Sequence, residues 1–103
     1  DNLLSVQEPI LNNEISKNIS SLNIYPNPVL ENTNLSFELN KSNIISVIIY
    51  NINGSVVKTL YNNVMFNNGY HTLPVSTSEL PIGTYLITLS SGDEQKVTKF
   101  IKY

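Results

Sequence analysis

Few residues in this chain are of a type that could carry out chemistry, and their spacing does not form a recognisable site. His71 is the only histidine, so a zinc site that used it would need carboxylate partners. The acidic residues show no Asp-x-Asp spacing, and the adjacent pair Asp93-Glu94 is typical of a solvated turn rather than of a calcium site. The chain has no cysteine, which excludes disulfides, thiolate catalysis and cysteine zinc sites. We therefore expect neither a metal ion nor a cofactor.

The serines and tyrosines do not indicate a catalytic or sugar-binding site either. Serines are abundant, so a Ser-His-Asp triad stays open, but no serine lies in a G-x-S-x-G turn. His71 is more typical of a strand residue with a hydrogen-bonded ring than of a general base. The tyrosines are scattered over several predicted elements, which favours packing roles over stacking on sugar rings: Tyr25, Tyr50, Tyr61, Tyr70, Tyr85 and Tyr103. We expect no catalytic residues, and a protein that is not an enzyme.

The composition limits the class of protein and of partner. With 103 residues there is room for one domain, and 41% hydrophobic residues are enough for a core. Only 14% of residues are charged, against about 25% in typical soluble domains, so asparagine and serine supply much of the polar surface. The net charge of −2 argues against nucleic acid as a partner. No apolar run approaches the roughly 20 residues that cross a bilayer, so we expect no membrane insertion.

Short apolar runs alternate with turn signals along most of the chain, which is the pattern of an all-β domain. Leu35, Phe37 and Leu39 alternate with polar residues, as in a strand with one buried face. Residues 44–52 are apolar on both faces, which is typical of a strand central to its sheet. The Asn53-Gly54 pair that follows predicts a hairpin with a type I′ turn. Residues 62–69 are rich in asparagine and predict an irregular loop.

The remaining segments complete this pattern. Residues 71–76 alternate and contain Pro74, which predicts an edge strand or a bulge. A turn over residues 80–83, a strand over 84–90 and a second hairpin at 91–93 follow. The final strand, residues 95–103, places Lys96 and Lys102 on one face and Lys99 on the other. We therefore expect an immunoglobulin-like, antiparallel β-sandwich of about seven strands.

The first 21 residues differ from the rest. Pro9 interrupts them, and the spacing of Leu11, Ile15 and Ile19 is only weakly helical. We interpret residues 1–21 as a linker from an upstream cargo domain and residues 22–103 as the folded domain. Because the chain begins at Asp1 without methionine or a signal peptide, we expect it to be a piece of a longer protein.

Five motifs occur in an order that resembles one known family. They are residues 22–28 (LNIYPNP), 49–57 (IYNINGSVV), 69–73 (GYHTL), 80–87 (LPIGTYLI) and 96–102 (KVTKFIK). Each is common alone, but together they closely resemble the type A C-terminal sorting domain of the type IX (Por) secretion system, over residues 22–103. One departure is Asn51, where the family often has aspartate. This removes a charge near the hairpin and should not alter the turn.

The resemblance implies a non-catalytic secretion signal. The translocon in the outer membrane would recognise the domain after Sec-dependent export to the periplasm. A cell-surface sortase would then cleave the domain off or exchange it for a surface anchor, with cleavage within residues 1–21 or upstream. The protein would therefore be secreted or held at the cell surface.

The resemblance also implies which residues the translocon would recognise: Pro81, Gly83, Tyr85, Lys96, Lys99 and Lys102. The three lysines would offer a small positive patch. The same residues could instead serve only the fold, since strand lysines commonly deter edge pairing. If the final strand has an accessible edge, the translocon could add a strand to it, or a second copy could do so in a weak dimer.

Two other functions stay open. An immunoglobulin-like adhesive or carbohydrate-binding module of a surface protein would predict an exposed aromatic cluster or a metal-bearing loop. A structural spacer attached to an enzyme would affect the stability of its neighbour rather than its location.

Overall fold

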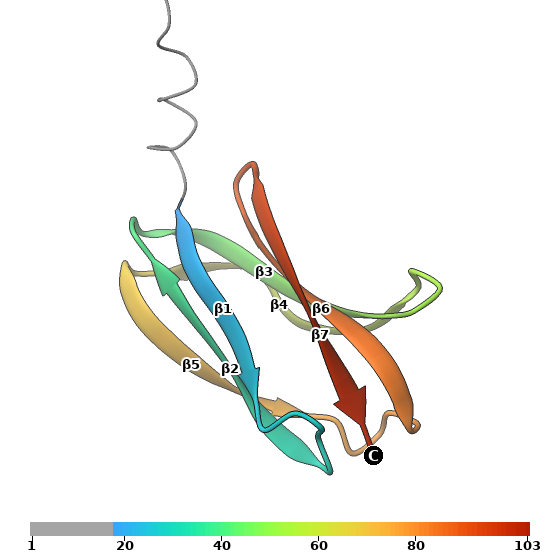
Figure 1. Ribbon diagram of the computed structural model, residues 1–103. Helices are drawn as coiled ribbons and strands as arrows, with labels where there is room; N and C mark the ends of the chain where they lie inside the picture. Colours follow the sequence, from blue (N-terminus) through green and yellow to red (C-terminus); the bar gives the residue numbers. More distant parts are fainter. Residues whose placement is uncertain (1–17) are drawn as a thin grey trace, which may run out of the picture.

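The computed structural model describes residues 18–103, which form seven antiparallel strands (Figure 1). The strands are β1 (Ile19–Tyr25), β2 (Asn32–Leu39), β3 (Asn43–Asn51), β4 (Val56–Phe66), β5 (Gly69–Ser76), β6 (Gly83–Ser91) and β7 (Glu94–Lys102). Within this range no helix is long and apolar enough to cross a membrane.

The strands form two layers, as the sequence predicts for a sandwich. One sheet has the order β1-β2-β5 and the other the order β4-β3-β6-β7. In a constant-type immunoglobulin domain the fourth strand lies beside the fifth, whereas β4 here pairs with β3. The predicted central position of residues 44–52 is confirmed, because β3 lies between β4 and β6. Pro74 lies in β5, an edge strand, which is where a residue without a backbone N–H is expected.

The core lies between the layers and comes from alternate residues of the strands. The alternation of Leu35, Phe37 and Leu39 is confirmed, since all three are buried. The buried side chains opposite them belong to the four-stranded sheet: Ile45, Val47, Ile49, Tyr85, Ile87, Leu89 and Phe100. Burial of these apolar side chains is the main force that holds the layers together.

The hairpin at Asn53-Gly54 is confirmed, but the predicted type I′ turn is wrong. Gly54 has a φ of 88°, whereas Asn53 is not among the residues with positive φ. Gly54 N donates to Asn51 O at 3.0 Å and Asn51 N donates to Ser55 O at 2.9 Å. This is a type I turn followed by a glycine in the left-handed region, the usual three-residue hairpin loop.

The predicted irregular loop over residues 62–69 is also wrong, because β4 continues to Phe66. Val64 and Met65 pair with Ile45 and Ile44 of β3. The register shifts along this ladder, and Asn63 takes a left-handed φ of 57°. Its backbone N–H donates to Ser46 Oγ at 3.0 Å, so a side chain from β3 takes the place of a ladder bond.

The first strand begins before the start of the domain that we predict from the sequence. β1 includes Ile19, which is buried, and Asn18 before it is buried as well. Residues 1–17 lie outside the described residues, and so does most of the predicted linker. The division of the chain into linker and domain stays a prediction.

The Asn51 side chain makes a testable contribution to the β3–β4 hairpin. Its Oδ1 accepts hydrogen bonds from Asn53 N at 2.9 Å and from Ser55 N at 3.0 Å. Asn51→Asp keeps an acceptor in place, so we expect the free energy of unfolding to change by less than about 0.5 kcal/mol. Asn51→Leu removes the acceptor and should cost about 1–2 kcal/mol. Urea unfolding of both variants compares them; equal stabilities would contradict this role.

Candidate recognition surface

Three segments that are far apart in the sequence meet at one end of the sandwich (Figure 1). They are the β1–β2 connection (residues 26–31), the β5–β6 connection (residues 77–82) and the end of β7. We call this end the terminal pole. It contains residues from three of the five sequence motifs. Of the residues that the resemblance implies for recognition, Pro81 and Lys102 lie in these segments, Gly83 and Tyr85 follow in β6, and Lys96 and Lys99 lie earlier in β7.

The β1–β2 connection is bonded to the edge of β7. Val29 N donates to Ile101 O at 2.7 Å, and Tyr103 N donates to Val29 O at 2.8 Å. The Asn27 side chain adds two bonds, because its Oδ1 accepts from Ile101 N at 2.9 Å and its Nδ2 donates to Lys99 O at 3.2 Å. Pro26 and Pro28, which flank Asn27, both follow cis peptide bonds. β7 is therefore an edge strand whose last residues are covered, so strand addition at this part of the edge would require the connection to leave.

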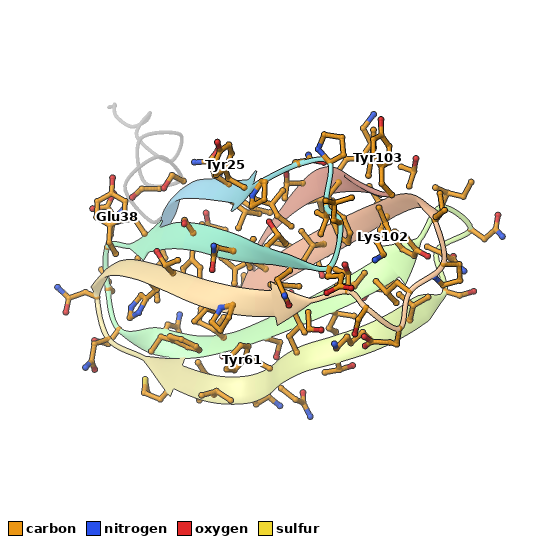
Figure 2. The ribbon with its side chains drawn as sticks, turned by 90° about the horizontal axis from the view of Figure 1, so that it is seen from below. Tyr25, Glu38, Tyr61, Lys102 and Tyr103 are labelled. Carbon is orange, nitrogen blue, oxygen red and sulfur yellow. The ribbon has the colours of Figure 1, made fainter. Side chains whose placement is uncertain are left out.

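Lys102 points inward at the terminal pole instead of toward solvent. Only 6% of its surface is exposed, and its Nζ donates a hydrogen bond to the backbone carbonyl oxygen of Leu30. In Figure 2 Lys102 lies within the outline of the sandwich, while Tyr103 projects from it. A buried ammonium group needs such a partner, because an unpaired buried charge is very costly. Lys102 therefore holds the β1–β2 connection against the end of the four-stranded sheet.

Tyr85 fixes the β5–β6 connection in a similar way. It is 5% exposed, and its hydroxyl group donates to Pro81 O at 2.6 Å. Its ring stacks on Phe100, with centroids 5.5 Å apart and planes 22° apart. Gly83 lies between the two bonded residues, and a Cβ placed there would lie 4.0 Å from the Tyr85 ring, an ordinary contact.

The β5–β6 connection is also bonded to its two other neighbours. Thr77 donates to Glu31 O through its backbone N–H at 2.7 Å and through its hydroxyl group at 3.0 Å. On the other side, Lys58 Nζ lies 2.6 Å from Glu79 Oε2 and donates to Ser76 O at 2.8 Å. The hydrogen bond from Lys58 is the main reason that the pKa of Glu79 lies below its ordinary value. The terminal pole is thus one bonded unit.

The three terminal lysines do not form one patch. Lys96 and Lys102 lie on the inner face of β7, half-buried and buried, whereas Lys99 is exposed on the outer face. Pro81 is exposed and Gly83 half-buried. Of the residues implied for recognition, Pro81 and Lys99 are therefore the two whose side chains a receptor can reach most directly.

The opposite end of the sandwich anchors the start of the described chain. Glu94 Oε1 accepts hydrogen bonds from Asn18 N at 2.6 Å and from Ile19 N at 3.1 Å. The Asn18 side chain donates to Ser91 Oγ at 3.1 Å and accepts from Lys41 N at 2.6 Å. Sequence patterns did not indicate this anchor, since Glu94 reads as part of a solvated turn.

His71 has a structural environment, as the sequence suggests. Its Nε2 lies 2.7 Å from Asn67 O, and because a carbonyl oxygen only accepts, Nε2 carries the proton. The ring stacks on Phe37 at 5.3 Å and meets Phe66 edge to face at 5.1 Å. Among residues 18–103 no three histidine or acidic side chains are grouped so as to hold a metal ion. None of the exposed tyrosines, Tyr25, Tyr70 and Tyr103, stacks on another ring in that range.

Comparison with known proteins decides what kind of domain carries this surface. A family model described as the secretion system C-terminal sorting domain matches residues 23–103. The chain belongs to this family. No curated protein matches it. The predicted resemblance to the sorting domains of the type IX system is thereby confirmed, while the type A subdivision stays a prediction.

As a type IX sorting domain, the chain marks a protein that is secreted or attached at the cell surface by way of the outer membrane. The segments of the terminal pole are joined to one another by Asn27, which belongs to the first motif, and by Val29 and Thr77, which the sequence alone did not single out. The one available sequence signal for these contacts was an asparagine between two prolines. Neither proline has a backbone N–H to donate, whereas the asparagine side chain can both donate and accept hydrogen bonds.

The Tyr85 hydroxyl group should contribute to stability through its bond to Pro81. Tyr85→Phe keeps the stacking on Phe100 but leaves the Pro81 carbonyl unpaired, which should cost about 0.5–1.5 kcal/mol. The control is Tyr50→Phe, which removes a half-buried hydroxyl group from the other face of the same sheet and should change stability by less than about 0.5 kcal/mol. Urea unfolding compares the two; an equal loss in both would contradict the assigned bond.

The Lys58–Glu79 pair predicts a pH dependence. Because the pKa of Glu79 is lower in the folded state than in the unfolded chain, the pair stabilises the fold above the ordinary carboxyl pKa. That stabilisation is lost as the pH falls through the folded-state value. Lys58→Met should raise the pKa of Glu79 toward its ordinary value, as measured by NMR titration of its carboxyl group. Lys99→Met, which removes a distant lysine, should leave the titration unchanged; a shift there as large as in Lys58→Met would contradict the pairing.

Proposed function

We propose that this domain is a non-catalytic signal that the outer-membrane translocon of the type IX system recognises in its folded form. A cell-surface sortase then cleaves it off or exchanges it for a surface anchor. The observation that carries the proposal is the terminal pole, where separate family motifs are bonded into one surface. A linear signal would not need its residues brought together in this way.

Four of the six candidate recognition residues have one of two roles in this proposal. Pro81 and Lys99 are exposed and contact the translocon. Tyr85 and Lys102 are buried, so they act as positioning residues that hold the Pro81 and Leu30 segments in place. Gly83 and Lys96 are half-buried and are assigned neither role: Gly83 lies beside Lys102, whereas Lys96 pairs with Leu89 near the other end of β7.

Cleavage falls before Asn18 in this proposal, within residues 1–17 or upstream of them. The backbone N–H groups of Asn18 and Ile19 are bonded to Glu94, and β1 is paired with β2 from Ile19 onward. A protease that needs an extended substrate could cut there only if this strand left its sheet. The protein that is transported lies N-terminal to the domain in the same chain.

The first test is export of a fluorescent cargo that carries a Sec signal and is fused to residues 1–103, in a host with an intact type IX system. We expect the cargo in the medium or on the cell surface. In a matched strain that lacks the translocon, it should remain in the periplasm. Cargo that stays in the periplasm of both strains contradicts the proposal and favours a carbohydrate-binding module, which a glycan screen then examines.

Truncation of β7 is a poor variant for this test. Deleting residues 96–103 removes Phe100 from the core together with Lys102, so loss of export would follow from loss of the fold. Point substitutions of exposed residues avoid this ambiguity.

A further inference from the structure

The outer faces of the two sheets differ in their chemistry. The outer face of the three-stranded sheet is mostly polar, although Tyr25, Tyr70 and Pro74 are also exposed on it. Its polar residues are Ser21, Asn23, Asn34, Ser36, Glu38 and Thr72. This agrees with the general pattern of a sandwich, in which apolar residues point to the core and polar residues point to water. The four-stranded sheet does not follow this pattern.

The outer face of the four-stranded sheet carries apolar side chains from every strand, with polar residues such as Thr88 and Thr84 between them. Cross-strand pairing places Tyr50 beside Val56 and Leu86, and Ile48 in one row with Thr88 and Val97. We call six of the apolar residues of this face the outer band: Ile48, Tyr50, Val56, Leu86, Val97 and Ile101. They come from all four strands of the sheet. Ile44 and Met65, which pair with each other, are also exposed on this face.

The core does not require the outer band. The inward-facing residues of these strands already fill the space between the layers, and Ile45, Val47 and Ile49 are fully buried without any contribution from the other face. By contrast Val97 is 53% exposed and Val56 is 56% exposed. An exposed apolar patch of this kind in a soluble domain commonly marks an interaction site.

One charged residue, Lys99, lies beside the outer band. Lys99 pairs with Leu86 and is exposed, and it is the single charged residue among the outward positions of β3, β6 and β7 in the described chain. A lone cation in an apolar surface favours a partner that is itself apolar and presents one carboxylate, because burying the lysine without a partner would be costly.

The outer band also reaches the terminal pole. Ile101 pairs with Thr84, and the next pair along the ladder is Gly83 with Lys102. Ile82 and Tyr103, which follow this last pair, are exposed as well. The apolar surface therefore continues from the sheet to the end where the family motifs meet.

We propose that the outer band is the docking surface for an apolar protein surface of the type IX secretion machinery, with a carboxylate placed opposite Lys99. This inference rests on the proposed sorting function and assigns it to a face of the domain. Flat packing of the band against a partner removes its apolar area from water, while the polar face of the three-stranded sheet stays in solvent.

Export of the same fluorescent fusion tests the inference. Val97→Asp and Ile101→Asp each place a charge in the band, and each should lower translocon-dependent export by roughly tenfold or more. Lys99→Glu should also lower it, whereas Lys99→Arg should keep it. The control is Tyr70→Asp, an exposed aromatic residue on the outer face of the other sheet, which should be exported like the unchanged domain.

A check of folding and a second kind of variant keep these outcomes distinct. Thermal unfolding by circular dichroism checks each fusion domain, and Lys99→Glu decides the question if an apolar-to-aspartate variant does not fold. Export of the unchanged domain that does not depend on the translocon contradicts the proposed function. Normal export of the unchanged domain and of all folded band variants contradicts the docking surface alone.

Light scattering of the isolated chain tests the other possible partner of the outer band, which is a second copy of this chain. We expect a monomer, because the band is assigned to another protein. A stable dimer that Val97→Asp converts to a monomer would assign the band to a second copy and would overturn the inference.

Discussion

The backbone bridge between Val29 and the end of β7 is the interaction on which the terminal pole depends. The two layers of a sandwich otherwise meet through side chains, but here Val29 exchanges hydrogen bonds with Ile101 and Tyr103. The bridge closes the end of an edge strand and fixes the β1–β2 connection in place. It also sets the position of the Leu30 carbonyl group, and only with that acceptor in place is the burial of Lys102 tolerable.

The bridge explains why the family motifs can be short and far apart in the sequence. Tyr85 and Lys102 belong to different motifs, and each donates to a carbonyl oxygen of a connection that has no regular secondary structure. Their side chains are buried, so they fix the backbone of the terminal pole but do not form its exposed surface. In the proposed function, a residue can therefore belong to the signal without touching the translocon, by holding in place the backbone that the translocon contacts.

Much of the fold could be predicted because its determinants are local. The period of two in residues 35–39, the proline of β5 and the Asn53-Gly54 turn each act within a few residues. Apart from the type of the Asn53-Gly54 turn, the errors arose where a distant residue decides the outcome. The asparagines around Asn63 predict a loop, but Ser46 Oγ of the neighbouring strand accepts a hydrogen bond from the backbone N–H of Asn63, and β4 continues. Alternation placed Lys96 and Lys102 on one face of β7, but no local pattern could indicate that this face is the interior, since the acceptor for Lys102 lies in the β1–β2 connection.

The few charged residues of the chain are explained in part by the uncharged polar residues that cover one face of the sandwich. Asparagine and serine in the sequence indicate turns, and many of them do lie in turns, but others cover the three-stranded sheet. This face presents hydrogen-bonding groups to water without the strong field that a charged surface would create. The opposite face carries more aliphatic side chains, and Lys99 is the one charged residue among the outward positions of β3, β6 and β7 in the described part of the chain. In the proposed docking, this division between the faces lets the three-stranded sheet stay in contact with water while the outer band packs against the partner.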